Sequence, residues 1–509
     1  MDWSAAATFL SGSDYTIARE VILRGVAAIY FLAFLSTFHQ FPVLAGARGL
    51  LPVPRFIDRT RAKDYPGLFR LKWFPYSDRK LRILCLIGMA LAVSVVAGLP
   101  QLGPGWATIP VFLVMWLMYL SIVNLGQRFY GFGWETMLLE AGFIVGFLGS
   151  TAVAPPLLIL LFLRWLMFRL EFGAGMIKMR GDASWRNLTA MYYHHQTQPM
   201  PNPVSRWAHQ KPQWWHRGEA LGSHIVQLGM PWLLFFPQPI ASFAACAIIL
   251  SQGILVVTGN YAWLNWLTII LAFSGISDSF LRWVGGLFTG GAVWPGWEWE
   301  TIGRLDAGAG MHGPAWWLIL TGVVFLFLLS LSWQPLHNLF WAQRQQMNAS
   351  FNRFHLVNAY GAFGSMTKDR REFVIEGAMS AAPRPEDWRA YEFRGKPGDP
   401  SRMPRQFAPY HLRLDWLMWF AALGAYREVW FSRILDRILE GDPGIRRLLR
   451  IDPFYGEAPR LIRVRIFEYR YSTAAEKRMN GDWWVREERG LLVRPQGLRT
   501  SRAKRAAEE

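Results

Sequence analysis

Four charged side chains lie inside long apolar stretches, where a charge is both costly and informative. Glu140 lies in one stretch, and the next contains Arg164, Arg169 and Glu171. A charge within a hydrocarbon core has to be paired, or has to serve a substrate or a proton. Arg164 and Glu171 are seven residues apart, so a helix would place them on one face. The four residues therefore indicate either a buried ion-pair network or a substrate or proton site.

A further candidate is Lys178, which follows the small residues 173–175. Small residues permit close helix packing. In one interpretation Lys178 extends its ammonium group to a membrane interface while Asp182 caps the next helix. In the other, Lys178 is desolvated and acts as a base. The residue types and their spacing leave both interpretations open.

Histidines are concentrated in one connecting segment, and they raise the question of a metal site. They are His194, His195, His209, His216 and His224. No carboxylate stands at a helical ligand spacing beside the adjacent pair His194 and His195, so we expect aromatic and polar contacts here and no metal site. The two cysteines, Cys85 and Cys246, lie in apolar runs, which excludes a disulfide framework.

The elements that must position these residues are long apolar segments. The chain of 509 residues is 52% hydrophobic and 18% charged, and stretches with almost no charge recur up to about residue 333. A helix needs roughly 20 apolar residues to cross a bilayer, and continuous runs exclude a barrel. We therefore predict an α-helical membrane bundle of about nine spanning helices, near 19–41, 83–99, 106–126, 136–150, 155–177, 221–237, 240–258, 261–281 and 314–333.

Two long connections, 42–82 and 178–220, are predicted to be ordered, the second because it is rich in aromatic residues. The net charge of +18 lies mainly in such connections and in the tail. Anionic lipid headgroups are the expected partners of this charge. Nucleic acid is not expected, because no nucleic-acid-binding motif accompanies the charge.

The pattern changes after residue 340, where charge returns and apolar runs shorten. Residues 371–379 and 461–471 read as strands, and the alternation in the second slips after Ile466, which predicts a bulge or bend. Residues 411–440 read as helical. We predict two domains, a transmembrane domain over residues 1–340 and a soluble C-terminal α+β domain over residues 341–509.

Several long motifs resemble the lipase maturation factor family. They span most of the chain and comprise 130–135, 138–143, 166–169, 178–189, 192–203, 259–260, 264–268, 358–364 and 414–420. The resemblance implies a membrane-embedded factor that helps lipases, or other secreted clients, to fold and assemble by binding them. Such a protein would lie in the endoplasmic reticulum membrane of a eukaryote, or in the inner or plasma membrane of a bacterium.

The family motifs also mark residues for binding or structural roles. These are Asp182, Trp185, Gln198, Asn202, Asn260, Asn265, Asp415 and Trp416. The resemblance links client handling to the region after the fifth apolar segment and to the C-terminal domain. It makes an enzymatic activity less expected than a binding function.

A more distant likeness runs to the vitamin K-dependent carboxylases and HTTM-type membrane proteins. Residues 174–185 are similar to the region of that enzyme that holds a lysine base, which makes Lys178 the catalytic candidate. The likeness implies a lipid-soluble, quinone-like cofactor. The Asn-His pair of that enzyme has no counterpart, since residues 134–137 read Trp-Glu-Thr-Met. This alternative is a membrane enzyme, although not evidently a carboxylase.

The side of the membrane that holds the C-terminal domain is left open by two opposing arguments. The family resemblance implies the lumenal or periplasmic side. With nine spans, both long connections and the tail share one side, which holds most of the Arg and Lys, and the positive-inside rule would make that side cytoplasmic.

Overall fold

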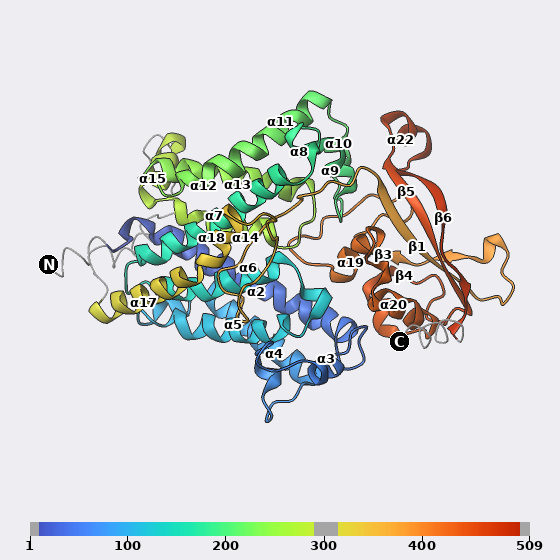
Figure 1. The fold of residues 1–509 in the computed structure, drawn as a ribbon, viewed down its shortest axis with the longest axis horizontal. Coiled ribbons are helices and arrows are strands. Elements are labelled where there is room, and N and C mark those ends of the chain that lie inside the picture. Colours follow the sequence, from blue (N-terminus) through green and yellow to red (C-terminus); the bar gives the residue numbers. More distant parts are fainter. Residues whose placement is uncertain (1–9, 290–313, 499–509) are drawn as a thin grey trace.

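The computed structural model describes residues 10–289 and 314–498. These residues form a large helical part and a smaller C-terminal part that holds a β-sheet, and the two lie side by side (Figure 1). The long helices of the helical part are α2 (Thr16–Leu44), α4 (Asp78–Val96), α5 (Thr108–Val123), α6 (Gly133–Val145), α7 (Leu157–Arg180), α13 (Ile240–Thr258), α14 (Leu264–Ala272), α15 (Asp278–Thr289) and α17 (Ala315–Leu331).

Helix α2 is the central element of this part and packs against α4, α6 and α14. Glycines allow the closest of these contacts. A Cβ on Gly88 of α4 would lie 2.5 Å from the ring of Phe34, and one on Gly142 of α6 would lie 2.0 Å from the hydroxyl of Tyr30. Neither neighbour could remain in place beside a larger residue, so the glycines set the distance between helices.

Every predicted apolar segment coincides with helix, but length and hydropathy support fewer spans. Within residues 10–289 and 314–498, two helices are long and apolar enough to cross a membrane, Ser13–Leu44 and Ile240–Thr258, or up to four if each of two bent pairs is one span. One bent pair contains α14 and α15, whose axes differ by 99°. The predicted segment 261–281 is therefore not one straight helix, and the number of about nine spans stays a prediction.

Both long connections contain helices. The first carries α3 (Val53–Arg59). The second carries α8 (Ala183–Arg186), α9 (Met191–Thr197), α10 (Ser205–His209) and α11 (Gln213–His224), and α11 continues through a π-helical turn into α12 (Met230–Leu233). After α17 comes α18 (Trp333–Phe340), from which the chain crosses to the C-terminal part.

The C-terminal part contains a four-stranded antiparallel sheet of order β2-β1-β5-β6. Its strands are β1 (Arg370–Ala378), β2 (Arg389–Ala390), β5 (Leu461–Tyr471) and β6 (Trp484–Gln496), and a separate pair is formed by β3 (Glu392–Phe393) and β4 (Leu449–Ile451). The two strands predicted from alternation are β1 and β5. The β5–β6 register shifts between Ile466 and Phe467, where the sequence slips phase.

Helices α19 (Arg413–Ala422) and α20 (Val429–Leu439) lie between the sheet and the helical part, and α22 (Ala474–Asn480) lies at one end of the sheet (Figure 1). Helix α21 (Pro443–Leu448) packs against α20 and α2. The predicted single helical stretch 411–440 is thus two helices, separated at Gly424, whose φ is +121°. One apolar core is continuous across both parts, because buried residues of α2, α6, α19 and α20 belong to the same cluster.

Candidate functional site

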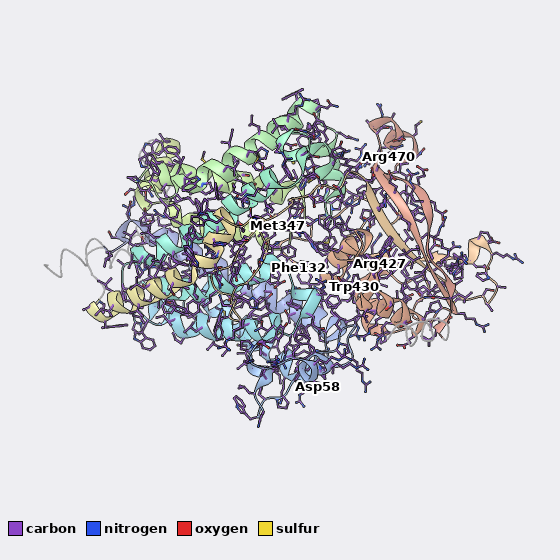
Figure 2. The ribbon with its side chains drawn as sticks, viewed as in Figure 1. Asp58, Phe132, Met347, Arg427, Trp430 and Arg470 are labelled. Carbon is purple, nitrogen blue, oxygen red and sulfur yellow. The ribbon has the colours of Figure 1, made fainter. Side chains whose placement is uncertain are left out.

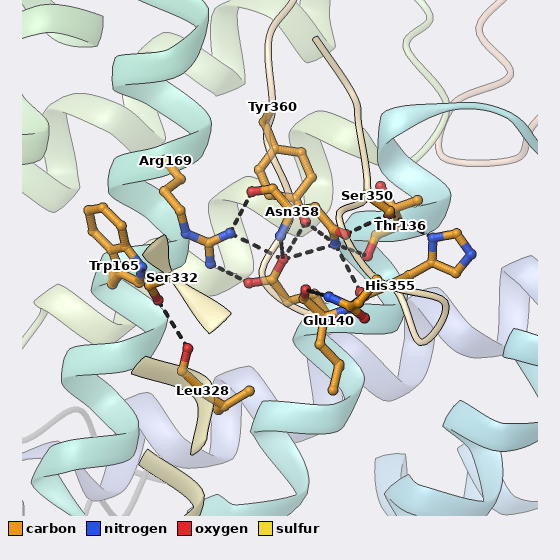
Figure 3. Close-up of polar contacts among 12 residues, drawn as sticks. Thr136, Glu140, Trp165, Arg169, Leu328, Ser332, Ser350, His355, Asn358 and Tyr360 are labelled. Atoms are coloured by element: carbon orange, nitrogen blue, oxygen red, sulfur yellow. Dashed lines mark hydrogen bonds and ion pairs between the residues drawn. The ribbon is translucent and has the colours of Figure 1, made fainter. Parts of the chain in front are cut away.

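The first charge cluster joins α6, α7 and the segment that follows α18 (Figure 3). Arg169 pairs with Glu140, and both side chains are at most 2% exposed. Glu140 also accepts hydrogen bonds from the backbone N–H of Asn358 at 2.8 Å and from the hydroxyl of Tyr360 at 2.8 Å. Arg169 in turn donates to the carbonyl of Asn358 at 2.7 Å. The paired charges therefore hold the 358–360 segment against the helices.

The other two charges predicted for this network have different partners. Arg164 donates to the carbonyl oxygens of Ser274 and Leu234, at 2.9 and 3.1 Å. Glu171 accepts from the side-chain amide of Gln252 at 2.6 Å. The four charges thus occupy three separate sites on the helices rather than one network. The sequence spacing on α7 is right, but spacing cannot say which neighbouring helix each side chain meets.

Lys178, near the end of α7, is buried. Its Nζ donates to the hydroxyl of Ser223 at 3.0 Å and lies 4.2 Å from the centre of the Trp185 ring. A cation over an indole face is favourable. The same indole donates from Nε1 to the carbonyl of Phe363 at 2.7 Å. The geometry therefore places Lys178 and Trp185 in one packed contact between α7, α8, α11 and the 363 segment.

Asp182 also holds the segment around residues 363–366 against α8. It caps α8 by accepting from the N–H of Ser184 at 2.8 Å, and it also accepts from the N–H of Met366 at 3.1 Å. Its own N–H donates to the carbonyl of Gly364. A Cβ on Gly181 would lie 2.1 Å from that carbonyl oxygen. The backbone segments at Gly181 and Gly364 are therefore too close for any residue larger than glycine at position 181.

Three buried amides of the family motifs contact α13, two of them from the histidine-rich connection and one from α14. Gln198 donates to the carbonyl of Thr258 at 2.9 Å and accepts from the hydroxyl of Tyr261 at 2.7 Å. Asn202 donates to the carbonyl of Val257 at 2.7 Å. Asn265 donates to the side chain of Gln252, at 2.7 Å, within the helical part.

Asn260 reaches the C-terminal part directly. Its Oδ1 accepts from the N–H groups of Phe407 and Ala408, at 2.7 and 2.8 Å. Its Nδ2 donates to the carbonyl oxygens of Pro201 and Arg405, at 3.2 and 2.9 Å. One fully buried side chain therefore satisfies four backbone groups of two segments, and an apolar residue would leave them unpaired.

The strongest contact between the two parts is one that the sequence did not reveal. Arg413 of α19 pairs with Glu135 of α6, Nη1 to Oε1 at 2.5 Å, and both side chains are 0% exposed. Tyr119 donates its hydroxyl to the other oxygen of Glu135. Glu135 lies in a family motif, but its partner is 278 residues further along, and spacing carries no signal for such a pair.

Aromatic rings surround this ion pair. Trp134 and Trp416 meet edge to face, with ring centres 4.7 Å apart, and Phe132 stacks on Trp134 at 4.6 Å. Figure 2 shows Phe132 near the middle of the molecule, where the helical part meets the C-terminal part, with Trp430 on the C-terminal side. Trp416 therefore acts as a packing residue in this joint.

Asp415, on the other side of α19, accepts from the N–H of Gly395 at 2.6 Å. Burial raises the pKa of Asp415 to about 6, although the hydrogen bond from Gly395 and the charge of Lys396 favour the carboxylate. Lys396 pairs with Glu372 at 2.6 Å, and burial lowers the pKa of Lys396 to about 8. Asp415, Lys396 and Glu372 are thus held within the core of the C-terminal part.

The histidines gather more closely than the sequence predicts, and a carboxylate stands among them. His195 and His216 both face Glu219, which lies three residues after His216 on α11. The prediction of no metal site took account only of carboxylates beside His194 and His195. The signal that could have found this group is the sequence His216-x-x-Glu219, since residues three apart share a helix face.

Taken together, the motif residues form a joint that fixes the C-terminal part to the helical part, with side chains in packing and hydrogen-bonding roles. Among the described residues, Lys178 has no paired acidic side chain within ion-pair distance.

Comparison with known proteins identifies relatives along nearly the whole chain. Residues 17–283 match the model of the lipase maturation factor transmembrane domain, and residues 356–493 match that of the lipase maturation factor C-terminal domain. Lipase maturation factor 1 of Bos taurus is 36% identical, over 96% of this chain and 90% of that protein. The Homo sapiens protein of the same name is also 36% identical, over 96% and 89%.

Lipase maturation factor 2 of Gallus gallus is 30% identical, over 92% of this chain and 80% of that protein. No solved structure matches the chain significantly. The motifs quoted from the sequence thus agree with similarity that covers both the helical and the C-terminal parts.

Proposed function

Because this chain belongs to the lipase maturation factor family, we propose that it is a membrane-embedded factor that assists the folding and assembly of lipases by binding them. The single observation that carries the proposal is the 36% identity to lipase maturation factor 1 over 96% of the chain. The buried joint supports it, because a fixed C-terminal part offers a client one continuous surface.

We place the client surface where the histidine-rich connection meets the C-terminal part. Arg206 of α10 donates to the carbonyl of Ser472, at 2.8 Å, just before α22. Trp207, which follows Arg206 in the chain, is 56% exposed, and Met479 of α22 is 75% exposed. We propose that these two side chains belong to one apolar patch, because contiguous apolar patches on a folded protein commonly mark interaction sites. A partly folded lipase, which exposes apolar surface of its own, is a fitting occupant.

The test is complementation in cells that lack their own lipase maturation factor. The chain is co-expressed with a dimeric lipase, and the activity and mass of secreted lipase are measured. The paired variant Trp207→Ser/Met479→Ser should reduce active lipase several-fold while leaving the protein level unchanged. Trp73→Ser removes a 75% exposed tryptophan in the first connection and is the matched control. Unaltered lipase secretion by the paired variant would refute this surface.

The arrangement in the membrane is part of the proposal. The family model names a transmembrane domain, and apolar helices lie in that region. We propose about nine spans, a division into domains near residue 340, and contact of the basic connections with anionic lipids. Because a secreted client is met on the lumenal or periplasmic side, we place the C-terminal domain there, in the endoplasmic reticulum or inner membrane. A reporter fused after residue 509 tests this, since activity only in the cytoplasm would overturn it.

The carboxylase-like alternative, with a quinone-like cofactor, is not favoured. The relatives are named maturation factors.

A further inference from the structure

Three ionisable side chains from two helices form a group with the donor types of a metal site. They are His195 of α9, and His216 and Glu219 of α11. One ligand atom from each residue lies within 4.8 Å of the other two. The side chains of His195 and His216 are 1% and 4% exposed and that of Glu219 is 19% exposed, so the imidazoles are buried and the carboxylate is partly open to solvent.

The distances suit a small tetrahedral ion. Nε2 of His195 lies 3.3 Å from each carboxylate oxygen of Glu219, and Nδ1 of His216 lies 2.8 Å from Oε2. Zinc binds such atoms at about 2.0–2.2 Å, so its ligand atoms lie about 3.3 Å apart. The first separation already has this value, and the second needs to open by only about half an ångström.

The other ring nitrogen of His216 fixes its tautomer. Nε2 lies 3.2 Å from the carbonyl oxygen of His209, which can only accept, so Nε2 carries a proton. In the neutral ring the lone pair is then on Nδ1, which faces Glu219. Metal-bound histidines commonly donate their second N–H to a carbonyl in this way.

We propose that His195, His216 and Glu219 bind a divalent transition-metal ion, for which Zn²⁺ is the best fit. Two imidazoles and one carboxylate are a common zinc ligand set, and water completes the tetrahedron. Such an ion ties α9 to α11.

The tie would reach the sheet of the C-terminal part. Gln196, next to His195, accepts from the N–H of Tyr471 in β5 at 3.1 Å. An ion at His195 therefore stiffens the segment that meets this strand.

The test uses the full chain purified in detergent. After chelation and dialysis, the protein is titrated with Zn²⁺ and with Co²⁺, and bound metal is measured by mass spectrometry. We expect one ion per chain, visible Co²⁺ absorption bands of a tetrahedral site, and a rise in the thermal transition on adding Zn²⁺. A stripped wild-type protein that binds neither ion would overturn the proposal, whatever the variants do.

Variants locate the ion. His216→Asn and Glu219→Gln should each lose the Co²⁺ bands and the Zn²⁺-dependent thermal shift. His39→Asn removes an exposed histidine elsewhere and should keep both. Only variants that elute as a monodisperse peak are used. If none of them does, the titration of the wild-type protein alone tests the proposal. Retention of stoichiometric metal by a folded Glu219→Gln/His216→Asn protein would place the ion elsewhere and refute this site.

Discussion

Arg413 of α19 and Glu135 of α6 form a fully buried ion pair, with Nη1 and Oε1 2.5 Å apart. The pair joins the C-terminal part to the helical part. The guanidinium also lies 3.6 Å from the centre of the Tyr130 ring and donates to the carbonyl of Phe129. The joint between the two parts therefore depends on charge as well as on apolar packing.

Removing one partner of this pair should be strongly destabilising. Arg413→Met or Glu135→Gln leaves the other group buried without its partner, which costs about 3–5 kcal/mol. The free energy of unfolding in detergent, from urea titration, measures the loss. The double variant Glu135→Gln/Arg413→Met should regain part of it, because neither charge then remains buried.

Arg128 and Glu428 provide the matched control, since they also link the two parts, at 2.8 Å, but Arg128 is 67% exposed. Arg128→Ala should cost less than about 1 kcal/mol. Equal losses for Arg128→Ala and Arg413→Met would contradict the account of the joint.

Asn260→Ala should weaken the joint through lost hydrogen bonds alone. The substitution leaves the N–H groups of Phe407 and Ala408 and two carbonyl oxygens without their partner. We expect a loss of at least about 2 kcal/mol in the free energy of unfolding. Limited proteolysis should also release the C-terminal part sooner. Asn187→Ala, at an exposed asparagine, is the control and should leave both measurements unchanged.

Asp415 should make stability depend on pH. Its pKa is 3.8 in the unfolded chain, and burial raises it to about 6 in the folded protein. The folded state therefore holds the proton more tightly, and its stability falls as the pH rises from 4 through 6. Relative to Asp415→Asn, the wild-type protein should lose about 2 kcal/mol over that interval. Unfolding midpoints at pH 4, 5, 6 and 7 measure this, and parallel profiles of the two proteins would exclude the effect.

Lys178→Met should retain lipase maturation. The methionine keeps the length of the side chain and its contact with Trp185, and it removes the charge at a cost of about 0.5–2 kcal/mol of cation–π attraction. Secreted lipase activity in complemented cells should stay near the wild-type level. If a stably folded Lys178→Met protein matured no lipase, the ammonium group would have a chemical role and the enzyme alternative would return.

Sequence patterns located elements well wherever the signal is local. The alternation of Ile462 and Val464 that slips to Phe467 predicted both β5 and its irregular register, because side-chain alternation follows directly from strand geometry. The helices along the apolar segments were predictable because a long apolar run is also a local signal. The bend of 99° between α14 and α15 was not, because hydropathy carries no information on the direction of a helix axis.

The contacts of the site were predictable only in part. Family motifs pointed to Asn260, Gln198 and Asp415, which are buried in or beside the joint. Pairs such as Glu135 and Arg413 escape a single sequence, because neither residue type nor spacing relates groups so far apart. His216 and Glu219 were within reach, since a spacing of three on one helix is a local signal.

The pairing of Glu135 with Arg413 also sets an order for the protein's own biogenesis. Glu135 leaves the ribosome 278 residues before Arg413. At about 5–20 residues per second, the carboxylate spends on the order of tens of seconds without the guanidinium that neutralises it. In a chain that stops before α19, Glu135 stays among the helices without a partner for its charge. Membrane quality control removes proteins with defects of this kind. A factor that brings other proteins to maturity would thereby carry a checkpoint for its own completion.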